Sequence, residues 1–138
     1  MKLVYNGLVR AKKNSKQIAV DHSGRPFIMS NKDVQAMERD MVEQFQLQMP
    51  PEMLGMNQTE RILKAKKEGK TYEVMVTIFN PNKIRRDLDN QLTSVLDGLV
   101  RAGALPDDCA SLLTSIHAKF GGIDRQYPRA EIEIKEST

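Results

Sequence analysis

Alternating apolar and polar residues predict β-strands at several places along the chain. The clearest pattern covers residues 71–79, where every second side chain from Tyr72 to Ile78 is apolar and β-branched residues are frequent. Residues 129–135 alternate as regularly, which is typical of an antiparallel strand with one buried face. We also expect strands at 2–9 and 112–120, the second of them ended by a turn at Gly121-Gly122.

Near the N-terminus, residues 17–29 predict a β-hairpin. Two short apolar runs flank Asp21-His22-Ser23-Gly24, and these residue types favour a tight turn. The segment before the hairpin, residues 10–16, is a polar and basic loop.

Two longer stretches show helical spacing of their apolar residues. In residues 32–47 these are Val34, Met37, Met41 and Phe45; Ser30 is a candidate N-cap, and Pro50-Pro51 ends the pattern. From Leu88 to Ala102 the spacing is stronger, and Gly103 is a natural stop. Between these helices, residues 59–68 form either a short helix or an irregular basic segment that faces DNA or solvent.

These elements predict a mixed α/β fold of the α+β type, with a small mixed sheet, an N-terminal hairpin and two main helices. A length of 138 residues favours one domain, 1–138. A single cysteine, Cys109, excludes an intramolecular disulfide and a Cys-based zinc site within one chain. No apolar run has the length of a membrane helix, and Met1 to Tyr5 lack a hydrophobic signal region. We therefore expect a cytoplasmic protein without a membrane partner.

The charge is distributed unevenly. Residues 1–86 hold 16 Lys/Arg and 9 Asp/Glu, a balance of +7, whereas residues 87–138 hold 5 and 9, a balance of −4, giving the net +3. A basic first part suits a polyanion such as nucleic acid, and a solvated surface of mixed charge is the alternative.

Candidate chemistry is concentrated where the strand at 71–79 gives way to the helix that follows. Asp87 and Asp89 stand beside Arg85 and Arg86, and Asp108 comes after the helix. Carboxylates of this kind suit a hard divalent cation such as Mg²⁺, and the adjacent cations suit phosphates. Such a site hydrolyses a phosphodiester. The alternative is that Asp87 caps the helix and Asp107-Asp108 makes an ordinary turn.

Spacing alone does not bring Asp108 to the other two carboxylates. It reaches them only if the chain folds back or if a second subunit brings its own copy. Other chemistries fit less well, since the chain has no Gly-x-Ser-x-Gly and no phosphate-binding glycine loop. An EF-hand counted from Asp87 would have Leu92 and Gly98 where Gly and Glu are needed.

The run Arg85-Arg86-Asp87-Leu88-Asp89-Asn90, followed by Leu96-Asp97-Gly98-Leu99, Ala102-Gly103 and Asp107-Asp108, resembles the RusA-type Holliday junction resolvases. The match covers about residues 83–120, with a weaker one at Lys13-Asn14-Ser15-Lys16 and Arg25-Pro26-Phe27. These are small endodeoxyribonucleases of DNA recombination and repair, often carried by prophages.

The resemblance implies a RusA-like homodimer that uses Mg²⁺, or Mn²⁺ in its place, to resolve four-way DNA junctions by paired nicks. It implies that Asp87, Asp89 and Asp108 are the catalytic, metal-binding residues and that Arg86 contacts DNA phosphates. With the basic residues around it, this gives the phosphate-contact set Lys12, Lys13, Lys16, Arg85 and Arg86.

One position departs from the family. Well-known members have a functional lysine one helical turn after the second Asp, whereas this chain has Thr93. Either Lys83 or Arg85 takes over, or activity is altered. Two further functions therefore stay open: a junction-binding protein with weak or lost catalysis, and, as the weakest option, a metal-dependent hydrolase of small phosphates.

Overall fold

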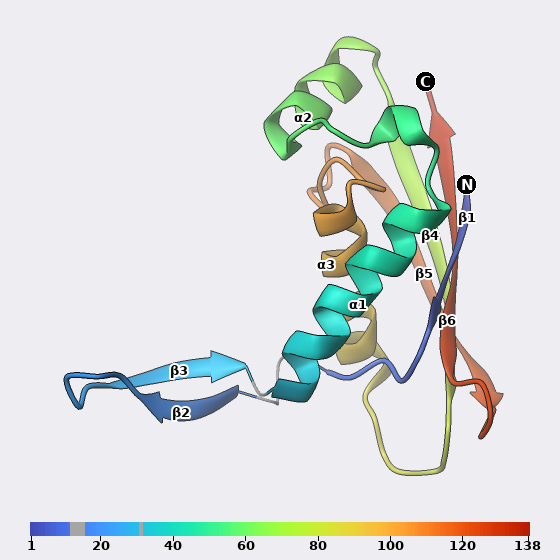
Figure 1. The fold of residues 1–138 in the computed structure, drawn as a ribbon. Coiled ribbons are helices and arrows are strands. Elements are labelled where there is room, and N and C mark those ends of the chain that lie inside the picture. Colours follow the sequence, from blue (N-terminus) through green and yellow to red (C-terminus); the bar gives the residue numbers. More distant parts are fainter. Residues whose placement is uncertain (12–15, 31) are drawn as a thin grey trace.

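The protein is built on a four-stranded sheet with helices packed on one face (Figure 1). A computed structural model describes residues 1–11, 16–30 and 32–138. The sheet has the order β1-β6-β4-β5. Its strands are β1 (Lys2–Asn6), β4 (Thr71–Asn80), β5 (Leu113–Ile123) and β6 (Arg129–Ser137). β4 and β5 are parallel, and the other two pairs are antiparallel.

The register places apolar side chains of three neighbouring strands on the same face. Val76 of β4 lies opposite Ile132 of β6, and Ile132 lies opposite Leu3 of β1. All three side chains are buried. The alternation predicted for 71–79 and 129–135 is therefore confirmed, because burial follows every second residue along both strands.

Two long helices cover this face of the sheet. α1 (Lys32–Gln48) and α3 (Leu88–Ala102) match the predicted helices closely. α1 buries its four predicted apolar residues, and Gly98 of α3 lets the two helices approach. A methyl group at Gly98 would meet the side chains of Met41 and Phe45. Gly103 ends α3 with φ 88°, the left-handed conformation that favours glycine.

The predicted hairpin is present as β2 (Lys16–Val20) paired with β3 (Pro26–Ser30). Figure 1 shows it projecting from the rest of the molecule beside the start of α1. The Asp21 carboxylate holds the turn by accepting hydrogen bonds from the backbone N–H groups of Ser23 and Arg25. The Arg25 N–H is the main reason why the pKa of Asp21 lies below its usual value.

The segment between the long helices contains a helix of its own. After a 3₁₀ turn η1 (Pro51–Met53), α2 (Gln58–Lys67) is a regular helix. Of the two conformations that the sequence left open for residues 59–68, the short helix is therefore the one present. Asn57 begins it, because the side-chain oxygen accepts from the Glu60 backbone N–H at 2.9 Å while the side-chain amide donates to the Glu60 carboxylate. This cap stabilises the start of a short basic helix.

Two strand boundaries differ from expectation. β1 ends at Asn6 rather than at residue 9. The next residue, Gly7, has φ 153°, and a Cβ there would meet the Tyr5 side chain. β5 runs through Gly121-Gly122 instead of turning there. The register shifts at this point, and a Cβ at Gly121 would lie 2.6 Å from the Phe79 ring. The glycines therefore form an irregularity within the strand that makes room for an aromatic ring.

The turn after β5 is formed by Asp124. Its carboxylate accepts from the backbone N–H groups of Gln126 and Tyr127 and pairs with Arg129 at 2.8 Å.

The expectation of a mixed α+β fold is confirmed at the level of a mixed sheet with helices. None of the helices within the described residues is long and apolar enough to span a membrane.

Candidate functional site

The loop between β4 and α3 carries the charged run that the sequence singled out. Asp87 stands at the N-cap position of α3 with extended backbone, yet its side chain makes no capping hydrogen bond. About half of that side chain is exposed (48%), with Oδ1 3.6 Å from Arg85 Nε and Oδ2 3.5 Å from Asn90 Nδ2. The capping alternative therefore does not account for this carboxylate.

Asp89 lies in the first turn of α3 and is exposed. Its Oδ1 accepts a hydrogen bond from the backbone N–H of Asn90 at 2.9 Å. Asn90 itself is buried. Its backbone N–H binds Asp89 and its side chain contacts Asp87, so it links both carboxylates to the start of the helix. In the sequence, Asn90 is part of the motif and has no predicted role.

A buried polar network fixes this end of α3 to the rest of the fold. Gln91 Nε2 donates to the carbonyl oxygen of Val9 at 2.9 Å and to Asn80 Oδ1 at 2.8 Å. Ser94 donates to the carbonyl oxygen of Arg10 at 2.7 Å. These contacts tie the helix to the end of β4 and to the N-terminal segment, so the carboxylates stand on a rigid base. Sequence reasoning missed Gln91 and Asn80, whose signal is a polar residue on an otherwise apolar face.

The cations of the loop differ in their freedom. Arg85 is almost fully exposed (93%) and has Asp87 as its ion-pair partner. Arg86 is half-buried, and its Nη1 donates to Asn82 Oδ1 at 2.9 Å and to the Ile84 carbonyl at 3.2 Å. Lys83 is exposed. Arg86 therefore braces the loop, while Arg85 and Lys83 are turned to solvent.

Asp108 lies in the loop that joins α3 to β5. The Oδ1 atom of its neighbour Asp107 accepts the backbone N–H of Asp108 at 2.9 Å. The Asp108 side chain is exposed, and within the described part of the chain it has no hydrogen-bond or ion-pair partner. Within the described residues, the pair therefore has one carboxylate that is hydrogen-bonded to the local backbone and one that has no partner.

The fold keeps Asp108 away from the other two carboxylates of the same chain. α3 separates them, and its 15 residues span about 22 Å at a rise of 1.5 Å per residue. β4 and β5 are also parallel, so their N-terminal ends lie side by side. Asp108 precedes β5 and therefore lies near the N-terminal ends of these strands, whereas Asp87 follows β4 and lies near their C-terminal ends. Among the described residues, no three His, Cys, Asp or Glu side chains are grouped to hold a metal ion.

Thr93, which stands where the resemblance implies a lysine, is turned to its own helix. Its hydroxyl donates to the Asp89 carbonyl oxygen at 3.0 Å. It supplies no charge to the site. The cation that pairs with Asp87 in the described structure is Arg85.

The remaining predicted DNA contacts cannot be placed at the site. Lys12 and Lys13 lie outside the described residues, as does the side chain of Lys16, whose backbone begins β2. These three stay predictions. The predicted cap residue Ser30 likewise has no described side chain.

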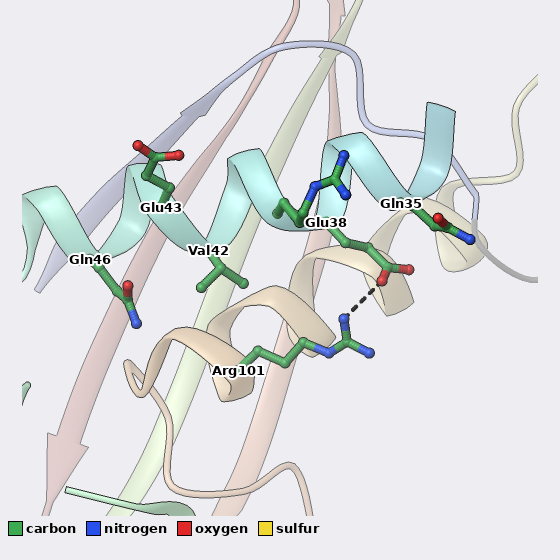
Figure 2. Close-up of a pocket in the computed structure, with 7 residues that line it drawn as sticks. Gln35, Glu38, Val42, Glu43, Gln46 and Arg101 are labelled. Carbon is green, nitrogen blue, oxygen red and sulfur yellow. Dashed lines mark hydrogen bonds and ion pairs between the residues drawn. The ribbon is translucent and has the colours of Figure 1, made fainter. Parts of the chain in front are cut away.

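A separate hollow of about 580 Å³ lies between α1 and α3. Figure 2 shows Arg101 of α3 reaching Glu38 of α1 along it, with a nitrogen-to-oxygen distance of 2.8 Å. Arg101 also pairs with Asp97 of its own helix. None of the predicted site residues lines this hollow, and its charges stabilise the packing of the two helices.

Comparison with protein-family models and with curated proteins found no match for this chain.

Proposed function

We propose that this protein is a metal-dependent, structure-selective endodeoxyribonuclease that nicks four-way DNA junctions in recombination or repair. The observation that carries the proposal is Asp87, a carboxylate at a helix N-terminus that does not cap the helix. It is exposed and 3.6 Å from Arg85, and Lys83 and Asp89 are exposed in the same stretch of chain, so that a phosphate and a divalent cation can both approach. The likeness of the 83–108 run to the RusA-type resolvases supplies the substrate class.

The donor set fits Mg²⁺ in part within one chain. Mg²⁺ takes one or two carboxylates, several waters and substrate phosphate oxygens, and Asp87 with Asp89 would provide the carboxylates. A bound Mg²⁺, or Mn²⁺, would polarise the scissile phosphate and lower the pKa of a coordinated water. Asn90 would keep the Asp87 carboxylate oriented, and the N-terminus of α3 would favour the phosphate.

The third carboxylate would come from a second copy of the chain. Asp108 is exposed and lacks a partner within the described residues, but it lies beyond the far end of α3. In a two-fold dimer, each Asp108 would approach the other protomer's Asp87 and Asp89. Two equivalent sites would then match the two-fold symmetry of a four-way junction.

The loop cations would hold the DNA strand. Arg85 and Lys83 are exposed and would contact phosphates directly. Arg86 would contribute chiefly by holding the loop, since Nη1 is already engaged by Asn82 and Ile84. Arg85 is also the residue placed to supply the positive charge that Thr93 lacks.

A second function is favoured by Thr93. Its hydroxyl is bonded to the helix backbone and no cation occupies that turn, so a junction-binding protein with weak or lost catalysis is the alternative. The two functions differ in nicking rather than in binding.

The first experiment is cleavage of a mobile four-way junction, with a linear duplex of the same sequence as control, in Mg²⁺ and in EDTA. We expect symmetric nicks on the junction alone and only with Mg²⁺. Tight junction binding without nicks would establish the alternative. If the protein neither binds nor nicks the junction, both functions are excluded.

The shared site has its own test. Asp87→Asn and Asp108→Asn are each expected to be inactive alone. Mixed after subunit exchange, they form heterodimers in which one site combines an intact Asp87 and Asp89 with an intact partner Asp108, so single-strand nicking returns. If all three carboxylates acted within one chain, mixing would restore nothing.

A further inference from the structure

A groove of about 440 Å³ beside the 81–87 loop combines apolar walls with positive charge. Its apolar part consists of Ile84, Phe120 and Ile123, which are 66%, 50% and 41% exposed. Phe120 lies opposite the buried Ile78 in the register of β4 and β5, so it belongs to the helix-covered face of the sheet. β5 is an edge strand of the sheet, and Phe120 and Ile123 stay half-exposed within the described residues. Clustered exposed apolar side chains of this kind mark a binding surface.

The polar lining of the groove has one sign of charge. Lys83, Arg85 and Arg86 line it, and none of its described lining residues is acidic. Two other hollows among the described residues differ, since Glu38 and Glu43 line the one between α1 and α3, and Glu52, Glu68 and Glu136 line a smaller one beside α2. The groove therefore suits an occupant that is both anionic and flat or apolar.

We propose that this groove binds one unstacked DNA nucleotide, with the base against Phe120 and Ile123 and the phosphate against Lys83 and Arg85. The choice of DNA rests on the proposed function. A nucleotide has both required parts, a π-face and a phosphate, a few bonds apart. Bases at the exchange point of an opened junction have lost a stacking partner, so the cost of moving one into a protein groove is low.

Charge argues against a second copy of the chain as the occupant. In a two-fold dimer formed through this groove, the patch would meet itself and bring the same three cations of each copy together. Like charges facing each other oppose association. A nucleic acid strand instead neutralises them and releases its counterions.

The test is binding by the full chain in EDTA, so that no strand is cut. Three labelled ligands are used: a short oligothymidine, a four-way junction and a linear duplex. Phe120→Ala is expected to weaken binding of the first two about 5- to 150-fold, the range for loss of one base–aromatic stack, and to leave duplex binding unchanged. Phe120→Tyr keeps the ring and should bind like the wild type.

Met75→Ala is the matched control, because Met75 is 48% exposed but faces the opposite side of the sheet. It should leave all three affinities unchanged. Placing 5-iodouracil at the exchange point and irradiating the complex should crosslink the peptide that contains Phe120.

Three outcomes would overturn the proposal: equal weakening for the duplex, no effect of Phe120→Ala on oligothymidine and junction, or conversion of a dimer to a monomer by this variant in sedimentation. The last result would make the groove an interface between copies. Phe120-dependent binding of oligothymidine without junction preference would keep the groove assignment and reject the junction function.

Discussion

α2 and α3 each have at their N-cap position a residue that can cap a helix, and only the one at α2 does so. At α2, the Asn57 side chain accepts the Glu60 backbone N–H at 2.9 Å and also binds the Glu60 carboxylate. At α3, Asp87 makes no capping bond and is turned toward Arg85 and Asn90. The same position in a helix therefore serves structure in one case and leaves a carboxylate available for chemistry in the other.

The turns repeat this division. The carboxylates of Asp21 and Asp124 each accept backbone N–H groups of their own turns, and Asp107 accepts the N–H of the next residue. Asp108 does not, within the described residues. A residue type that favours caps and turns is thus informative when its side chain is not used for a cap or a turn.

The largest expected effect is on cleavage by Asp87→Asn. The variant should lose more than about 100-fold in nicking rate, because removing a metal ligand exceeds the 10–100-fold typical of a residue that only orients one. Junction binding should stay the same or become tighter, because a charge that repels phosphate is gone. Rates are measured by single-turnover nicking and binding by gel shift; nicking at the wild-type rate would remove Asp87 from the site.

Asn90→Ala should have the next largest effect. Asn90 orients Asp87 through Nδ2, so its loss should lower cleavage about 10- to 100-fold at limiting Mg²⁺ and less at high Mg²⁺. A Mg²⁺ titration of nicking separates this role from general damage. A loss that excess Mg²⁺ does not relieve would show that Asn90 acts through the fold.

Arg85→Ala should weaken junction binding and reduce the slope of log K against log salt by about 0.9, the value for one phosphate contact. Arg86→Ala should also lower thermal stability, because Arg86 braces the loop through Asn82. Lys119→Ala is a control cation on the opposite face of the sheet. An unchanged salt slope in Arg85→Ala would exclude Arg85 from the DNA contact.

Substitutions at the two N-cap positions should separate stability from activity. The one at Asn57 should lower the free energy of unfolding more, and the one at Asp87 should lower nicking more. Asn57→Ala should cost about 1 kcal/mol in the free energy of unfolding, the usual value for a lost cap, and leave nicking unchanged. Asp87→Ala should cost less than about 0.5 kcal/mol, since no capping bond is lost. Urea denaturation of both variants measures the difference, and equal costs would restore Asp87 to a capping role.

Sequence patterns predicted the periodic elements well. α1, α3, β4 and β6 follow from regular spacing of apolar residues, which reports burial directly, whereas the hairpin follows from its turn residues Asp21-His22-Ser23-Gly24. The path of β5 could not be predicted, because Gly121-Gly122 has the composition of a turn and only the Phe79 ring explains why the strand continues. Asn57 was overlooked because its value lies in a side-chain bond to Glu60, three residues on.

The site was predictable only locally. Arg85, Asp87 and Asp89 lie together because they are close in sequence. The position of Asp108 depends on the parallel pairing of β4 and β5, which no local pattern determines. Gln91 and Asn80 form their buried hydrogen bond across 11 residues. Both are polar, so a search for regularly spaced apolar residues does not find them.

The smallest expected effect concerns a carboxylate that does serve structure. The backbone N–H of Tyr127 and the Arg129 guanidinium lower the pKa of Asp124 below its ordinary 3.8. A pKa that is lower in the folded than in the unfolded chain stabilises the fold above the unfolded value, and this contribution is lost as the pH falls through the folded pKa. The melting temperature of Asp124→Asn should therefore be slightly below that of the wild type near neutral pH, with the gap closing in acid below pH 3.8. Equal melting temperatures of the variant and the wild type near neutral pH would show that the Asp124 carboxylate does not stabilise this turn.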